Sequence, residues 1–121
     1  NYMTTDQIKQ LSENGHTIGL HSWDHTMATK YKEENDWLQQ VVNPKAKLED
    51  ITGKPVCYWA YPNGVYDHQA AMELSRYFKL SFILSNKCDS IQPLQTVRRM
   101  IVPELTPQGL LKSMKRTFFS E

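Results

Sequence analysis

Two histidines four residues apart, His21 and His25, are the side chains of this sequence with the most distinctive chemistry. Imidazole is the commonest protein ligand for zinc and related metals, because the neutral ring offers a lone pair near neutral pH. A catalytic zinc site usually has three protein ligands and one open position. The pair therefore predicts part of a metal site, whose third ligand must come from elsewhere. Asp24 is a candidate, but its position between the histidines better suits a side chain that braces the loop.

A second unusual stretch, Tyr61-Pro62-Asn63-Gly64, also follows an expected strand. In parallel α/β proteins ligands bind at the carboxyl ends of the strands, so both stretches should face the same end of the sheet. Alternation along the strand places Trp59 and Tyr61 on one face and Tyr58 on the other. At least one of these faces is ordinary core, and Tyr61 is the best candidate among the three for a contact with substrate.

The elements that must position these stretches alternate between helix and strand. Capping residues, Gly and Pro signals and apolar spacing predict helices over 4–14, 33–42, 43–53, 67–77 and from 106 onward, and strands over 16–20, 56–61, 80–84 and 96–102. Asn43-Pro44 is expected to end one helix and start the next, and Leu110, Leu111 and Met114 should face inward. Alternation of this kind indicates parallel strands joined by helices. About four strands are too few for a closed barrel, so the fold class is α/β with part of a (β/α) barrel.

Composition excludes some partners. The formal net charge of +1 over 121 residues gives no basic surface for nucleic acid. No window approaches the ~20 apolar residues of a membrane span, and no signal peptide is visible. The chain opens on Asn1, and we expect it to be truncated at its N-terminus. Cys57 and Cys88 are expected at opposite ends of the sheet, roughly 20 Å apart, and hence as free thiols.

Two parts of the sequence, in order, resemble motifs of the polysaccharide deacetylases, the NodB-homology domain of carbohydrate esterase family 4. Residues 14–25 are similar to the second motif, His-(Ser/Thr)-x-x-His, with its usual lead-in. Residues 51–55 together with 59–64 resemble the third motif. They are closest to the branch with Phe-Ala-Tyr-Pro-x-Gly, found in poly-N-acetylglucosamine deacetylases. The resemblance runs from about Thr4 to Leu111.

This resemblance implies a distorted (β/α) barrel whose N-terminal strands are missing, with residues 1–121 as the C-terminal portion of a single domain. It implies a divalent metal, zinc first among them, held by one Asp together with His21 and His25. Ser22 would brace the loop. The backbone N–H of Asn63, beside Pro62, would help to stabilise the oxyanion.

The implied reaction is hydrolysis of N- or O-acetyl groups on an acetylated polysaccharide or oligosaccharide. Because such substrates lie outside the cytoplasm, the resemblance implies a periplasmic, cell-surface or secreted protein.

The sequence departs from the family pattern at three points. It contains no Asp-Asp pair, the first motif, which supplies the base and the third ligand. The arginine that some members place beside the base corresponds to Ala60, a loss that the variant branch shares. No Leu-x-His motif for the general acid occurs near 98–102, and His68 matches no motif and is expected at the surface of a helix start.

The alternative is therefore a non-catalytic carbohydrate-binding or structural relative. A strand with Asp-Asp upstream of Asn1 would favour the enzyme. The 121 residues alone are expected to be inactive, to bind zinc poorly, and to form homo-oligomers through exposed strand edges or be marginally stable.

Overall fold

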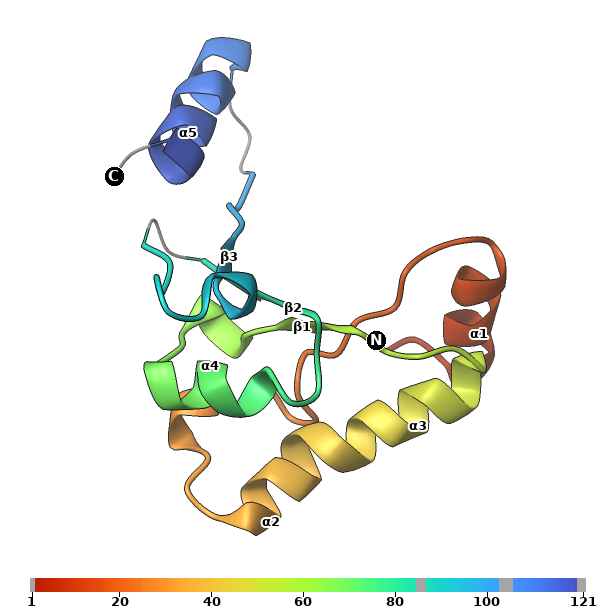
Figure 1. Cartoon of the computed structure of the whole chain (residues 1–121). Coiled ribbons are helices and arrows are strands. Elements are labelled where there is room, and N and C mark those ends of the chain that lie inside the picture. Colours follow the sequence, from red (N-terminus) through yellow and green to blue (C-terminus); the bar gives the residue numbers. More distant parts are fainter. Residues whose placement is uncertain (1, 85–86, 103–105, 120–121) are drawn as a thin grey trace.

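The structure is a computed structural model that describes residues 2–84, 87–102 and 106–119. At its centre lies a parallel three-stranded sheet of order β1-β2-β3, formed by Tyr58–Ala60, Leu80–Ile83 and Val97–Arg98 (Figure 1). Helices precede and follow these strands, so the α/β class with parallel strands is confirmed. Each strand is shorter than its sequence pattern predicted.

Leu20 extends the sheet by one residue on the outer side of β1. Its N–H donates to the carbonyl of Tyr58 and its own carbonyl accepts from the N–H of Ala60, both at 2.9 Å. The expected strand over 16–20 is reduced to this single parallel bridge. Within the described residues no strand pairs with the far side of Leu20, and a segment with a partner on only one side has little to hold it extended.

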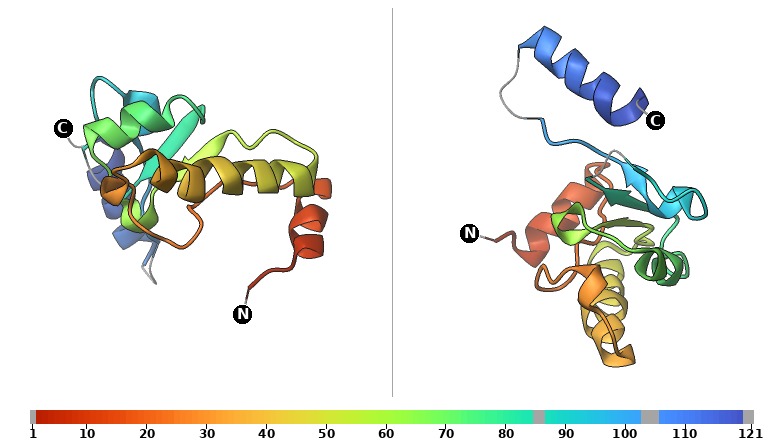
Figure 2. Two further views of the ribbon diagram at one scale, coloured as in Figure 1. Left: turned by 90° about the horizontal axis from the view of Figure 1, so that it is seen from below. Right: turned by 90° about the vertical axis from the view of Figure 1, so that its left-hand side faces the viewer.

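The remaining elements are helical. They are α1 (Thr5–Glu13), η1 (Ala28–Lys30), α2 (Glu34–Trp37), η2 (Leu38–Val42), α3 (Asn43–Thr52), η3 (Pro62–Gly64), α4 (His68–Leu74), η4 (Pro93–Gln95) and α5 (Pro107–Phe119). The continuous helix of α2, η2 and α3 and the shorter α4 lie on one side of the sheet, while α5 stands away from it (Figures 1 and 2). None of the described helices is long and apolar enough to cross a bilayer.

Local capping explains where several helices begin. Thr4 accepts a hydrogen bond from the N–H of Gln7, and the Gln7 side chain accepts one from the N–H of Thr4, so the predicted capping box is confirmed. Asp67 caps α4 through the N–H of Ala70 at 2.7 Å. Gly53 ends α3 in the left-handed conformation with a φ of 68°.

The predicted break at Asn43-Pro44 is wrong. The helix runs without interruption from α2 into α3 through η2, a π-helical segment in which the N–H of Asn43 donates to the carbonyl of Leu38. A proline has no N–H and its ring clashes with the carbonyl four residues before it. The wider π turn just before Pro44 alters the hydrogen-bond pattern at this point, so the proline is accommodated in the first turn of α3.

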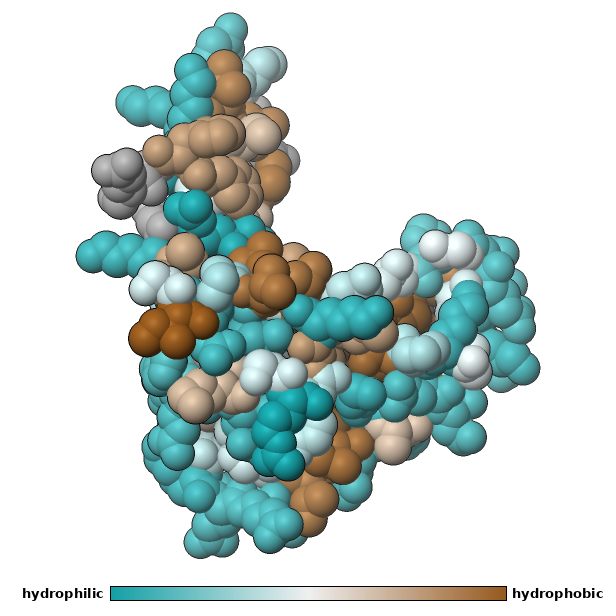
Figure 3. Space-filling view, in the orientation of Figure 1, coloured by the Kyte–Doolittle hydropathy of each residue, from teal (hydrophilic) through white to brown (hydrophobic). Residues whose placement is uncertain are grey.

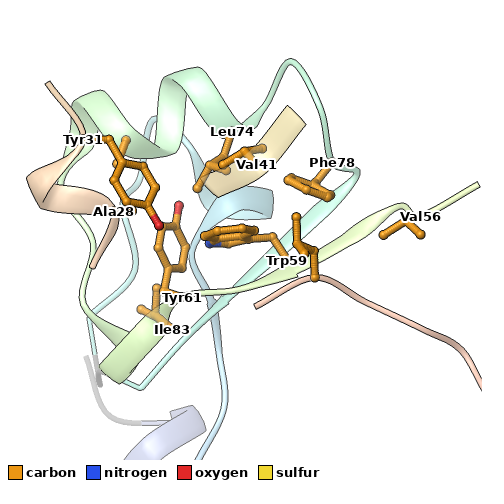
Figure 4. Packing of buried hydrophobic residues seen from close by; sticks show 11 residues of the cluster. Ala28, Tyr31, Val41, Val56, Trp59, Tyr61, Leu74, Phe78 and Ile83 are labelled. Carbon is orange, nitrogen blue, oxygen red and sulfur yellow. The ribbon is translucent and has the colours of Figure 1, made fainter. Parts of the chain in front are cut away.

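The core lies between the sheet and the helices. Trp59 and Tyr61 point from the end of β1 towards Leu74 of α4, with Phe78 packed against Trp59 (Figure 4). The ring centroids are 6.3 Å apart for Trp59 and Tyr61 and 5.6 Å for Trp59 and Phe78. This is the face that alternation assigned to Trp59 and Tyr61, and it is a conventional aromatic core.

The C-terminal helix departs from the expectation. Leu111 and Met114 are exposed and Leu110 is half-buried, so the predicted inward face of α5 is wrong for this structure. Apolar side chains gather on α5 and at its base (Figure 3). The strand predicted over 96–102 is paired only at β3. Where the chain offers α5 no apolar surface to pack on, amphipathic patterning alone does not bury it.

Both cysteines are free, as predicted, with Cys57 half-buried and Cys88 exposed.

Candidate active site

His21 is fixed in one tautomer by the end of β1. Its Nδ1 lies 2.7 Å from the carbonyl oxygen of Ala60. A carbonyl oxygen only accepts, so Nδ1–H must donate and Nε2 keeps the lone pair. This is the arrangement by which a backbone carbonyl orients a metal-binding imidazole.

His25 lies beside His21, as their spacing and the strand end predicted. The two ring centroids are 4.8 Å apart with their planes inclined at 69°. Both side chains are exposed to solvent. The residues from His21 to His25, called the His loop below, therefore present two imidazoles at the carboxyl end of the sheet.

Hydrogen bonds within the His loop hold it in a strained conformation. The Ser22 hydroxyl accepts from the N–H of His25 at 2.8 Å, and both residues have positive φ, 62° and 69°. Non-glycine residues seldom adopt this conformation, and such outliers cluster at functional sites. Ser22 thus makes the contact that a bracing residue would make.

Asp24 also braces the loop. Its Oδ1 accepts from the N–H of Thr26 at 3.0 Å and from the Thr26 hydroxyl at 2.6 Å. These two hydrogen bonds lower the pKa of the Asp24 carboxyl. The carboxylate is therefore engaged with its own loop.

A further anchor, Gln40, was missed by the sequence reasoning. Its buried side chain lies on the π-helical turn, and its Oε1 accepts from the N–H of Trp23 at 3.2 Å. The only signal in the sequence was a polar residue on the helix face that carries Trp37 and Val41. Gln40 ties the tip of the His loop to the helix behind it.

The stretch from Tyr61 to Gly64, called the 61–64 turn below, is η3 and its preceding residue. The N–H of Tyr61 donates to the carbonyl of Phe82 at 3.1 Å, and the N–H of Gly64 donates to the carbonyl of Tyr61 at 2.8 Å. Asn63 has a φ of 57° and Pro62 is buried. The turn is thus fixed to the ends of β1 and β2, next to the strand end from which His21 projects.

Tyr61 is not a substrate contact. Its side chain is 0% exposed, and its hydroxyl donates to the carbonyl of Gln95 at 3.0 Å. Burial raises the pKa of the phenol. Any additional chain could only cover this ring further, so the expected contact between Tyr61 and a sugar is corrected to a role in the core.

On the face of the sheet opposite to the core lies an open cavity of about 550 Å³. Its lining comes from the Leu20 segment, β1 and β2, and includes Gly19, His21, Ala60 and Phe82. His21 is therefore both a member of the His pair and part of the wall of this cavity.

The described residues do not complete a metal site. They contain no group of three His, Cys, Asp or Glu side chains that could hold one ion. The donor chemistry of His21 and His25 fits two positions of a zinc site, and nothing among the described residues adds the third. His68 lies apart from this pair at the start of α4, half-exposed, with Nδ1 2.6 Å from Oδ2 of Asp89.

The comparisons with known proteins that give a match find deacetylases. The family model of the polysaccharide deacetylases matches residues 2–79, more than half of the chain. A polysaccharide deacetylase from Bacillus cereus superposes with a TM-score of 0.81 at 24% identity, over 95% of this chain and 37% of the other. A Streptococcus pyogenes deacetylase in complex with acetate gives a TM-score of 0.77 at 21% identity, over 93% and 50% of the two chains.

At these identities the solved structures show the fold, and the chain spans only 37% and 50% of their lengths. Among curated proteins no match was found.

Proposed function

Since the chain belongs to the polysaccharide deacetylase family, we propose that it is part of an enzyme that hydrolyses acetyl groups from a carbohydrate polymer. The observation that carries the proposal is the pair of imidazoles, 4.8 Å apart, at the carboxyl end of a parallel sheet. Ligands bind at this end in open parallel sheets and in barrels.

We assign His21 and His25 as two ligands of a divalent cation, zinc first among them. When bound, such an ion polarises a carbonyl and lowers the pKa of coordinated water. The hydrogen bond from Nδ1 of His21 to Ala60 supports this role, because it leaves Nε2 as the donor atom. We propose that carboxylates outside the described residues would supply the third ligand and the general base.

The backbone N–H of Asn63 is proposed to stabilise the oxyanion that forms on the acetyl group. Two features support it: the left-handed conformation of Asn63 and the fixed 61–64 turn around it. A donor held in place before the reaction needs no reorganisation, and removing one such donor in another enzyme costs about 2.7–4 kcal/mol of transition-state stabilisation.

The sheet is proposed to be the C-terminal part of a single, distorted (β/α) barrel. The far side of Leu20 and the open cavity beside it would receive the strands that precede it. A chain without those strands would offer the same edge to a second copy, which favours homo-oligomers. Acetylated polysaccharides are extracellular, so we place the protein in the periplasm, at the cell surface or in the medium.

The proposal is tested by mass spectrometry of acetylated chitooligosaccharides incubated with the protein at its full natural length, with and without added zinc. We expect loss of acetyl groups that depends on zinc and falls at least ~10²-fold in His21→Ala and His25→Ala. His16→Ala is the matched control, because His16 is also an exposed histidine but precedes the sheet segment at its opposite end.

Unchanged turnover in the two loop variants would exclude them as ligands. A zinc-loaded protein that binds the oligosaccharide without releasing acetate would favour the non-catalytic relative.

A further inference from the structure

The two imidazoles of the His loop are held in different ways. The ring of His21 is oriented directly, because its Nδ1–H donates to the carbonyl of Ala60. No other described residue forms a hydrogen bond with the ring of His25, which packs edge-on against His21 instead. The position of the His25 imidazole therefore depends on the backbone that carries it.

That backbone is fixed on its C-terminal side by Thr26. The carboxylate of Asp24 accepts hydrogen bonds from the N–H and from the hydroxyl of Thr26, which closes a short turn around His25. The carbonyl of Thr26 accepts a further hydrogen bond, at 2.6 Å, from the hydroxyl of Tyr31. The two bonds to Asp24 are local, whereas the bond from Tyr31 joins this end of the His loop to the core.

Tyr31 is a rigid support for that bond. Its side chain is 6% exposed and belongs to the core cluster, next to Ala28 (Figure 4). Its ring is inclined at 87° to the ring of Trp37, and the two centroids lie 5.1 Å apart. The N–H of Tyr31 donates to the carbonyl of Ala28 at 3.1 Å, so the backbone is fixed as well. A side chain locked by packing in this way can hold a neighbouring group at a defined place.

The same phenol also interacts with Ser22. Burial raises the pKa of the Tyr31 phenol, and the Ser22 side chain opposes this rise to a smaller extent. Because burial is the larger effect, the phenol keeps its proton near neutral pH and donates it to the carbonyl of Thr26. Ser22 in turn accepts the hydrogen bond from the N–H of His25. One hydroxyl of the core therefore contacts both residues that fix the backbone of His25.

We propose that Tyr31 is a positioning residue, which sets where the His25 imidazole meets a metal ion. The inference rests on the proposed function, in which His21 and His25 are metal ligands. Tyr31 acts through Ser22 and Thr26 and does not bind the ion itself. Replacing residues that orient metal ligands from outside the coordination sphere typically costs about 10–100-fold in metal affinity.

The test compares Tyr31→Phe with Tyr61→Phe in the protein at its full natural length. Each change removes one hydroxyl from a buried ring and leaves one backbone carbonyl without its donor, that of Thr26 or that of Gln95. We expect both variants to lose stability. The zinc dissociation constant, measured by competition with a chelator, should rise about 10–100-fold in Tyr31→Phe and stay unchanged in Tyr61→Phe.

Two further measurements report on ligand geometry. Cobalt bound in place of zinc gives a visible spectrum that depends on the arrangement of its ligands, and this spectrum should change in Tyr31→Phe but not in Tyr61→Phe. Ser22→Ala removes the other side chain that contacts the phenol. Because Ser22 and Tyr31 act on the same backbone, Ser22→Ala should weaken zinc binding by a smaller factor in Tyr31→Phe than in the parent protein.

A metal-free measurement separates this inference from the proposed function. Hydrogen exchange at the amide of His25 should be about 2–10-fold faster in Tyr31→Phe than in Tyr61→Phe, the equivalent of one lost hydrogen bond. If the parent protein binds no zinc, the metal assignment fails, and the exchange rates alone decide whether Tyr31 positions His25. The inference is overturned if Tyr31→Phe binds zinc as tightly as the parent protein, if both variants lose the same affinity, or if exchange at His25 is equal in the two.

Discussion

The hydroxyl of Ser22 accepts a hydrogen bond from the backbone N–H of His25 at 2.8 Å, and both residues have a left-handed backbone. The bond closes the His loop across the two residues between them, Trp23 and Asp24. A left-handed conformation costs a non-glycine residue roughly 1–2 kcal/mol. The Ser22 hydroxyl therefore helps to maintain a backbone that is unfavourable by itself.

Replacing the Ser22 hydroxyl should separate two effects on stability, the loss of the hydrogen bond and the strain of the left-handed backbone. Ser22→Ala loses the hydrogen bond and keeps the backbone strain, so we expect the free energy of unfolding to fall by about 0.5–1.5 kcal/mol. Ser22→Gly loses the same bond but relieves the strain, so it should be more stable than the alanine variant by about 1 kcal/mol. Urea unfolding followed by circular dichroism measures both. A glycine variant less stable than the alanine variant would contradict the role given to the strain.

Tyr61→Phe should affect stability and not substrate binding. The change leaves the buried carbonyl of Gln95 without its donor at 3.0 Å, and an unsatisfied buried group costs about 1–3 kcal/mol. The matched control is Tyr66→Phe, whose hydroxyl makes a 3.3 Å bond to the carbonyl of Lys87 from a half-buried ring. Chemical denaturation should show a clearly larger loss for Tyr61→Phe. Equal effects would mean that burial of the Tyr61 hydroxyl has no energetic consequence.

Gly64→Ala should be among the most damaging single substitutions in the chain. A Cβ at this position would lie 2.3 Å from Cβ of Leu84 and 2.6 Å from its backbone nitrogen, at a φ of 67°. Gly53→Ala has nearly the same φ of 68° with nothing within 4 Å, so it isolates the backbone cost of roughly 1–2 kcal/mol. We expect Gly64→Ala to exceed this by at least ~1 kcal/mol, as measured by thermal unfolding. Similar losses in both variants would show that the 61–64 turn moves easily away from β2.

The acid side of the stability profile should depend on Asp89. A hydrogen bond from His68 is the main reason why the pKa of Asp89 is lowered, followed by one from the N–H of Ile91. A carboxyl whose pKa is lower in the folded state stabilises the fold above its unfolded pKa of about 3.9. That contribution is lost as the pH falls through the folded pKa.

Asp89→Asn should therefore flatten the decline in urea midpoint below about pH 4. Glu13 is exposed and forms no ion pair with the other described residues, so it offers a control position, where Glu13→Gln should leave the decline unchanged. If the urea midpoint of Asp89→Asn declined as steeply as that of the parent chain, Asp89 would not be the cause of the acid-side loss of stability.

The 121 residues alone should bind zinc weakly and show no deacetylation. The two imidazoles of the His loop leave at least one ligand position to water or buffer, and loss of a general base alone costs typically 10²–10⁴-fold in rate. Calorimetric titration with zinc, paired with the oligosaccharide assay, measures both. Tight one-to-one binding with turnover would mean that this chain holds a third ligand and a base not identified among the described residues.

Local signals in the sequence were sufficient for caps and turns. Thr4, Gly53 and Asp67 were placed correctly because each acts on neighbours within a few residues. The histidine pair was also predictable, because its motif lies in one short loop. The continuous helix at Pro44 was not, since the π turn that admits the proline depends on how the helix packs.

Long-range contacts gave little signal in the sequence, and for Gln40 it was only a polar residue on an apolar helix face. Gln40 contacts the His loop across 17 positions, and Arg99 contacts the 61–64 turn across 38. Contacts of this length follow from the register of the sheet and the phase of the helix, which short patterns do not encode. The exposure of α5 is a similar case, because burial of its apolar face depends on whether the rest of the chain provides a surface for it to pack on.

The π turn at Leu38–Val42 makes the His loop sensitive to insertions and deletions in a helix that carries no catalytic group. Deleting one residue there would restore regular α-helical hydrogen bonding and rotate the preceding turns by about 100° relative to α3. Gln40 would then leave the N–H of Trp23, although every residue of the loop itself stayed the same. In an alignment of related sequences, a one-residue gap between positions 38 and 42 would thus separate chains with an anchored loop from chains without one.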